Sequence, residues 1–131
     1  MPDYSIRPAR PKDEVPIRKL VALYPDKLIQ DDHPQTDKFL VAEASDGSLL
    51  GCCALDVYSK RLAEIRSLAV HADSLRSGVG AALVAACKKR AGDLGVRQLL
   101  AVSSAVDFFE RSGFSTFRQE RTALFYDVAG E

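Results

Sequence analysis

The change in hydrophobic period at Gly78 constrains the fold more than any other feature of the sequence. Before it, apolar residues gather in short runs separated by turns, which is typical of β-strands. After it, a long segment carries its apolar residues at helical spacing. The stretch that joins the two patterns, "DSLRSGVGAALV", holds two glycines two residues apart, Gly78 and Gly80. We therefore expect a strand that passes through a glycine loop into a helix.

The helix after this loop has one apolar stripe. A basic run at residues 88–90 lies largely off the stripe, which indicates a solvated face. Gly92 and Gly95 mark the end of the helix. The stripe consists of Val79, Leu83, Cys87, Ala91 and Leu94.

The other apolar runs predict an α/β fold with a mixed, mostly antiparallel sheet. Asp13 is the expected N-cap of the first helix. The turn "SDGS" predicts a hairpin, and the long helix requires the strands on either side of it to run parallel. Strands are expected at residues 4–9, 38–44, 48–59, 61–70, 97–103, 114–120 and 122–128, and the remaining helices at residues 13–24 and 105–113.

Length and charge limit the classes of protein that this chain can represent. Its 131 residues suit one domain, residues 1–131. Lys plus Arg and Asp plus Glu each number 18, so the chain lacks the positive charge of a general nucleic-acid binder. No apolar run approaches the roughly 20 residues of a membrane span, and charged residues and prolines stand where a signal peptide needs an apolar core. We expect a soluble, cytoplasmic protein without nucleic-acid or membrane partners.

The cysteines and histidines do not predict a metal site. Cys52, Cys53 and Cys87 make an odd count without metal-ligand spacing, and they lie in apolar runs. His33 and His71 are the two histidines. We expect buried, reduced thiols and no bound metal.

The glycine loop has the properties of a phosphate site. The first N–H groups of a helix have no partner inside it, and the helix dipole favours an anion there. The loop is not a P-loop, because Ala81 follows Gly80 where Lys is needed. "GVGAAL" matches only half of a dinucleotide fingerprint and follows a meander of strands. A glycine turn that binds nothing remains an alternative.

Two longer stretches carry a family resemblance. "AEIRSLAVHADSLRSGVGAALV" and "GVRQLLAVSSAVDFFERSGF" resemble the GNAT superfamily of acyl-CoA-dependent N-acyltransferases, over about residues 49–114. The similarity is closest to small amino-acid N-acetyltransferases of the N-acetylglutamate-synthase-like type. The resemblance implies a single GNAT-like domain whose central parallel strands splay apart between flanking helices. It also implies acetyl-CoA as the acyl donor and a small-molecule amine, such as an amino acid, as the acceptor.

The resemblance assigns the cofactor-binding residues. The family loop commonly begins with Arg or Gln followed by Gly, whereas this chain has Leu75 and Arg76 at those two places. Arg76 could supply the missing charge from one position along. The pantetheine arm would bond the backbone of Leu68, Ala69 and Val70, and the pyrophosphate would lie on Arg76, Ser77, Gly78, Val79, Gly80 and Ala81.

The resemblance also suggests the catalytic groups. Glu64 matches a strand glutamate that serves as general base in some lysine-acetylating relatives. The alternatives are a solvated carboxylate or a partner for Arg66 across a bulge. Arg66 could clamp a substrate carboxylate with its planar fork or form a structural ion pair. A backbone N–H at the splay would stabilise the oxyanion.

One expected catalytic group is missing. Many relatives carry Tyr four residues before the glycine of the last motif, where it protonates the leaving sulfur, but here that residue is Phe109. Phe108 and Phe109 are expected in the core or as an apolar wall beside the cofactor. Either the thiolate leaves without help, or another hydroxyl substitutes. The candidates are Ser103, Ser104, Tyr58 and Tyr126.

The sequence leaves the acceptor and the assembly open. Asp31 and Asp32 would favour a cationic amine, whereas Arg66, Arg118 and Arg121 would favour an acidic one. Relatives often form homodimers, but no feature here decides the oligomeric state. The alternative function is a non-catalytic module that binds acetyl-CoA and regulates a protein partner. A fold remnant without a cofactor, used for protein contacts, is a third possibility.

Overall fold

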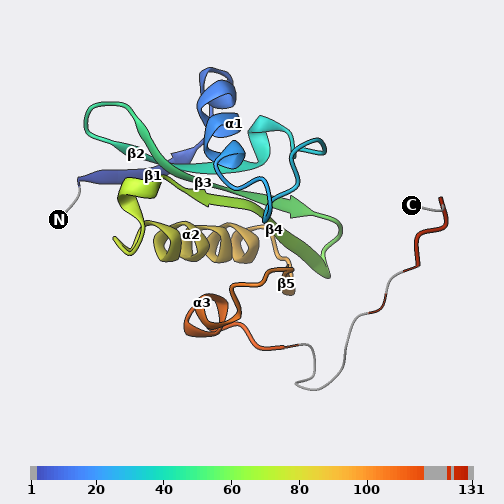
Figure 1. Cartoon of the computed structure of the whole chain (residues 1–131). Coiled ribbons are helices and arrows are strands. Elements are labelled where there is room, and N and C mark those ends of the chain that lie inside the picture. Colours follow the sequence, from blue (N-terminus) through green and yellow to red (C-terminus); the bar gives the residue numbers. More distant parts are fainter. Residues whose placement is uncertain (1–2, 117–123, 125, 130–131) are drawn as a thin grey trace.

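A twisted five-stranded sheet runs through the molecule (Figure 1). The computed structural model describes residues 3–116, 124 and 126–129. Its strands are β1 (Tyr4–Pro8), β2 (Phe39–Ala44), β3 (Leu49–Val57), β4 (Leu62–Val70) and β5 (Gln98–Ala101). Its helices are α1 (Glu14–Ala22), α2 (Val79–Asp93) and α3 (Val106–Arg111), with 3₁₀ turns η1 (Pro11–Asp13), η2 (Thr36–Lys38) and η3 (Ala72–Ser74).

The sheet confirms the predicted mixed topology. Its strands follow the order of the chain, β1-β2-β3-β4-β5. The first four pair antiparallel, and β5 pairs parallel with β4 because α2 carries the chain back across the sheet. The expected hairpin joins β2 to β3, and Gly47 supplies its residue with positive φ, +90°. The two predicted closing strands lie largely outside the described residues, and residues 114–116, 124 and 126–128 are not in strands.

The two longer helices cover opposite faces of the sheet (Figure 1). The face under α1 buries Phe39, Val41, Cys52, Ala54 and Ala69, and the face under α2 buries Leu40, Ala42, Cys53, Leu55, Ala63 and Ile65. The predicted stripe of α2 is buried as far as Ala91. Its last member was predicted wrongly: Leu94 is 53% exposed, because the helix ends at Asp93 and the chain turns away at Gly95 (φ +79°).

The close approach of α2 to β3 depends on Gly51. A Cβ on this residue would lie 3.0 Å from Leu83 Cδ1 and 3.1 Å from Val79 Cγ1. Nearby, the Sγ atoms of Cys53 and Cys87 are 3.5 Å apart between the strand and the helix. All three cysteines are free and buried, as predicted. The absence of a side chain at Gly51 therefore lets α2 begin directly against the sheet.

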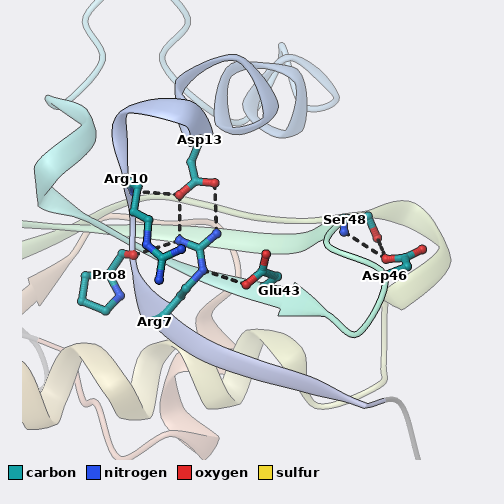
Figure 2. Close-up of polar contacts among 7 residues, drawn as sticks. All are labelled: Arg7, Pro8, Arg10, Asp13, Glu43, Asp46 and Ser48. Atoms are coloured by element: carbon teal, nitrogen blue, oxygen red, sulfur yellow. Dashed lines mark hydrogen bonds and ion pairs between the residues drawn. The ribbon is translucent and has the colours of Figure 1, made fainter.

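An ion-pair network that includes Asp13 holds the start of α1 against the sheet (Figure 2). Asp13 is at the N-cap position of α1, as predicted, but its side chain makes no cap hydrogen bond to the helix. Its Oδ2 instead accepts hydrogen bonds from Arg7 Nη1 at 2.8 Å and from the N–H of Arg10 at 2.7 Å. Arg7 Nε also donates to Glu43 on β2, at 2.8 Å. The guanidinium of Arg7, fixed on β1, holds the carboxylate on the sheet side of η1, away from the first N–H groups of the helix.

Because Asp13 is buried, its ion pair with Arg7 contributes to the stability of the fold. Asp13 is only 3% exposed, and the hydrogen bond from Arg7 lowers the pKa of its carboxyl below the usual value. The hydrogen bond to Asp13 in turn raises the pKa of Arg7. Both groups are therefore charged at neutral pH, and the removal of one leaves the other poorly compensated.

We predict that Asp13→Ala lowers the free energy of unfolding by about 3 kcal/mol, measured by urea denaturation. Glu14→Ala is the matched control, because Glu14 pairs with Arg18 on the exposed side of the same helix and should cost less than about 0.5 kcal/mol. The pKa of Asp13 is lowered in the folded state, so its contribution exists above the unfolded pKa and is lost as the pH falls through the folded value. The gap between wild type and Asp13→Ala should close below about pH 4. Equal losses in the two variants would contradict this role.

Candidate active site

The candidate site begins where β4 and β5 separate. Their parallel pairing covers four positions, from Leu62 opposite Gln98 to Ile65 opposite Ala101. There β5 ends, but β4 continues to Val70 with β3 on its other side. Among the described residues, no strand pairs with β4 along this edge beyond Ile65. Apart from the carbonyl of Val70, which accepts a hydrogen bond from Tyr24, the backbone groups that point to this side are therefore available to a ligand, as expected of splayed strands.

β4 contains a β-bulge just beyond Ile65, where its pairing with β5 ends. Cys52 faces Ala69 and Ala54 faces Arg66, so one residue of β3 stands against two of β4. One of the two, Ser67, has a left-handed φ of +54°. The bulge changes the order in which side chains face the two helices. Arg66 precedes it on the face that α1 covers, and Ala69 returns to that face beyond it.

The backbone at the end of β4 points into the gap. His71 donates its N–H to Leu50 of β3 at 2.7 Å, so the polar groups of the preceding residue, Val70, face the other way. The carbonyl of Val70 accepts a hydrogen bond from the hydroxyl of Tyr24, just after α1. Tyr24 is a site residue that the sequence analysis missed, because nothing in the sequence ties the end of α1 to the end of β4.

The glycine loop lies directly beyond this edge. Turns at residues 72–78 lead into α2, whose first N–H groups belong to Val79, Gly80 and Ala81. Two residues of the loop have left-handed backbones, Arg76 at φ +65° and Gly78 at φ +90°. No described atom lies within 4 Å of the place where a Cβ of Gly78 would be. An exposed loop with free helix donors and open space beside its glycine fits a phosphate or pyrophosphate.

Arg76 keeps the backbone conformation that a glycine would supply. The resemblance expects Gly at this place, and the chain adopts the left-handed conformation there with an arginine. Such a conformation costs a residue with a Cβ about 1–2 kcal/mol. The departure from the family pattern therefore changes the side chain but keeps a loop geometry that suits glycine.

The two phenylalanines of α3 have different surroundings. Phe109 is 9% exposed in the core under α2, and its ring packs edge-on against Phe108 and Phe114 with centroids 5.1 and 5.3 Å away. The ring of Phe108 lies 3.5 Å from the place of a Cβ on Gly80, close to Val70. Phe108 is thus the apolar residue beside the loop, while Phe109 supports it from within the core.

A polar cluster occupies the face of β3 and β4 opposite α2. The hydroxyl of Tyr58 donates a hydrogen bond to Glu64 Oε1. Asp56, which directly faces Glu64 in the register, bonds Lys38 Nζ at 3.1 Å and Arg66 Nη1 at 3.2 Å. Burial alone would raise the pKa of Asp56, but these two cations lower it below its usual value. Asp56 and Lys38 were not singled out in the sequence.

The side chain of Arg66 already has bonding partners within the protein. Besides Asp56, its guanidinium bonds the backbone carbonyl of Asp32 at 2.8 Å, and it does not pair with Glu64. In the part of the chain that the structure describes, no cation forms an ion pair with Glu64. Arg66 therefore forms a structural ion pair, with Asp56 and not with Glu64. Its role as a substrate clamp stays a prediction.

A cavity of about 490 Å³ opens between the start of α1 and residues 33–37, and none of the predicted site residues lines it. Among the described residues, no three His, Cys, Asp or Glu side chains gather as metal ligands. No helix within the described ranges is both long and apolar enough to span a membrane.

Comparison with known proteins agrees with this geometry. Residues 35–116 match the family described as "Acetyltransferase (GNAT) domain". An amino-acid acetyltransferase of Mycobacterium tuberculosis is 33% identical over 117 residues, which cover 84% of this chain and 67% of that protein. An uncharacterized N-acetyltransferase of Chlorobaculum tepidum is 35% identical over 82 residues, or 63% of this chain, and the chain spans about half (52%) of that relative.

Solved structures show the same fold with coenzyme A bound. A Mycobacterium tuberculosis protein in complex with CoA superposes with a TM-score of 0.78 at 32% identity, covering 83% of this chain and 70% of that one. N-acetylglutamate synthase from Neisseria gonorrhoeae, complexed with coenzyme A and N-acetyl-glutamate, gives 0.72 at 29% identity, over 82% of this chain and 27% of that one.

The chain belongs to the GNAT family of acetyltransferases, and within it is similar to amino-acid N-acetyltransferases. This is the class of N-acetyltransferases that use acetyl-CoA as the acyl donor. The open edge of β4 and the loop at residues 76–81 present unpaired backbone groups and open space beside Gly78.

We predict opposite effects for alanine at the two glycines of the loop. Gly78→Ala should lower the free energy of unfolding by about 1 kcal/mol, because a Cβ strains a backbone with φ +90°. Gly80→Ala should raise it by about 0.5 kcal/mol, because Gly80 is in α2 and its new Cβ would make ordinary contacts with Phe108 and Val70. Urea denaturation of both variants measures the difference. Destabilisation by Gly80→Ala as large as that by Gly78→Ala would contradict the described loop.

We predict that Glu64 controls the ionisation of Tyr58. Burial and the hydrogen bond to Glu64 raise the pKa of Tyr58 to about 12. In Glu64→Gln the negative charge is gone, so the pKa of Tyr58 should fall toward its ordinary value of 10. Near-ultraviolet absorbance of tyrosinate measures it, with Tyr58→Phe identifying the signal. An unchanged titration would show that the two side chains are not in contact.

Proposed function

We propose that this domain transfers the acetyl group of acetyl-CoA to the amine of a small molecule, and that the acceptor is an amino acid. The observation that carries the proposal is the separation of β4 from β5 after Ile65, with the glycine loop at the end of the exposed edge. The names of the similar amino-acid acetyltransferases, and the N-acetyl-glutamate bound to the similar synthase, support an amino-acid acceptor.

The residues around the gap would bind and orient the donor. The backbone of Leu68, Ala69 and Val70 would bond the pantetheine amides as an added strand would. The N–H groups at residues 76–81 would hold the pyrophosphate, with the side chain of Arg76 adding positive charge. Phe108, beside Gly80, would cover the apolar side of the bound arm. Acetyl-CoA supplies the acetyl group as a thioester, which an amine can attack.

Glu64 would take the proton from the attacking amine. Its carboxylate is on the strand that borders the gap, in register with Leu100, one position before β5 ends. A carboxylate without a cationic partner keeps its capacity to accept a proton, directly or through a water molecule. A backbone N–H at the splay would stabilise the developing oxyanion. Phe109 offers no proton to the leaving thiolate and is buried in the core.

The first test separates donor binding from catalysis. Calorimetry should give micromolar affinity for acetyl-CoA, about −8 kcal/mol. Gly78→Glu should weaken it, because the new carboxylate would stand among the donors of the loop. A screen of amino acids, with thiol release as the readout, then identifies the acceptor.

We predict that Glu64→Gln lowers turnover by about 10²- to 10⁴-fold and leaves the affinity for acetyl-CoA unchanged. The reason is that the amide cannot accept the amine proton, whereas the loop and the edge of β4 are untouched. Initial rates of thiol release and calorimetry on the same preparations measure the two effects. Full turnover in the variant would remove Glu64 from the mechanism. Tight binding without turnover on any amine would favour the regulatory module instead.

A further inference from the structure

The contacts of Tyr58 suggest a second residue that serves the proposed base. Tyr58 directly follows β3, and its backbone N–H bonds Leu62 of β4. Its side chain is thus diagonal to Glu64 on the same face of the sheet, within the reach of an aromatic side chain. The β3–β4 register thus brings the two side chains together at the exposed end of the hairpin, where Tyr58 is 54% exposed.

The cations beside Tyr58 and Glu64 bond one of two facing carboxylates and not the other. Two carboxylates face each other across β3 and β4, Asp56 and Glu64, an arrangement that is unfavourable by itself. Two cations, Lys38 from η2 and Arg66 from β4, bond Asp56, and Arg66 also bonds the backbone carbonyl of Asp32. Asp56 is thereby neutralised.

This leaves Glu64 with a neutral partner. Among the described residues the one hydrogen bond to its side chain comes from Tyr58, and it reaches Oε1. The residue opposite on β5 is the apolar Leu100. Burial and the neighbouring Glu64 hold the pKa of Tyr58 at about 12, so its hydroxyl remains a proton donor throughout the working range of pH. Oε2 remains available for the amine proton.

We propose that Tyr58 is a positioning residue for catalysis: its hydroxyl fixes Oε1 of Glu64 by a hydrogen bond that involves no cation. A cation in the same place would hold the carboxylate more strongly and reduce its capacity to accept a proton. A neutral hydroxyl orients the group and leaves that capacity largely intact. The inference rests on the proposed function, in which Glu64 is the base. It also takes Tyr58 out of the set of hydroxyls that could protonate the leaving thiolate.

The test is the kinetic profile (kcat and KM) of Tyr58→Phe, with the best amino acid from the screen as the acceptor. Loss of the hydroxyl should lower kcat about tenfold with KM changed less than about twofold, because substrate contacts are unaffected. The side chain of Glu64 loses the hydrogen bond that orients it, so the loss should appear in turnover and not in the affinity for acetyl-CoA. A purely structural role would not produce this split between kcat and KM.

Tyr4→Phe is the matched control. Tyr4 is on β1, at the opposite edge of the sheet, and loses the same atom. Its profile and rate should equal those of the wild type. Circular dichroism and calorimetry with acetyl-CoA, carried out on both variants, show whether each is folded and binds the donor.

A double variant distinguishes a failure of the proposed function from a failure of the inference about Tyr58. In the Glu64→Gln background, Tyr58→Phe should add no further loss, because the group that it positions is gone. If Glu64→Gln keeps turnover, or no acceptor releases thiol, the proposed function fails and the inference fails with it. If Glu64→Gln loses turnover but Tyr58→Phe keeps the wild-type profile, only the inference is overturned. An additive loss in the double variant would also overturn it, and would indicate that Tyr58 acts on the substrate directly.

Discussion

The parallel hydrogen bonding between β4 and β5 stops at the pair Ile65–Ala101, while β4 runs on for five more residues. Backbone N–H and C=O groups along such an edge need partners, and those that point away from β3 find no strand among the described residues. The bulge at Ser67 bends β4 in this segment. An extended ligand with amide groups would supply the missing partners in the same way as an added strand.

Packing on both faces keeps this edge in place. On one face, Gly51 lets α2 begin directly against the sheet, so the free donors at the helix start lie at the end of the exposed edge. Phe109 fills the core there and supports Phe108 beside the loop. On the other face, the buried pair of Arg7 and Asp13 fixes the start of α1 to β1. The exposed loop therefore joins two elements, β4 and α2, that are themselves packed in the core.

In the polar cluster, two carboxylates that face each other across the sheet have different partners. Asp56 takes both cations and is structural, while Glu64, directly opposite, keeps a neutral partner. The same contacts bear on the acceptor. Asp32 and Arg66, which pointed to acceptors of opposite charge, bond each other through the backbone carbonyl of Asp32. Two other candidates, Arg118 and Arg121, lie outside the described residues.

The local patterns of the sequence were sufficient to predict the hairpin at residues 45–48, α2 and the glycine loop. The reason is that turns, helical stripes and helix starts depend on neighbouring residues. The matching motifs also indicated the family. Contacts between distant segments were decided only by the tertiary structure. Asp13 was expected to cap α1 and instead bonds Arg7, and the partner of Glu64 proved to be Tyr58. Both outcomes follow from strand register and helix placement, which bring together residues whose pairing no local pattern encodes.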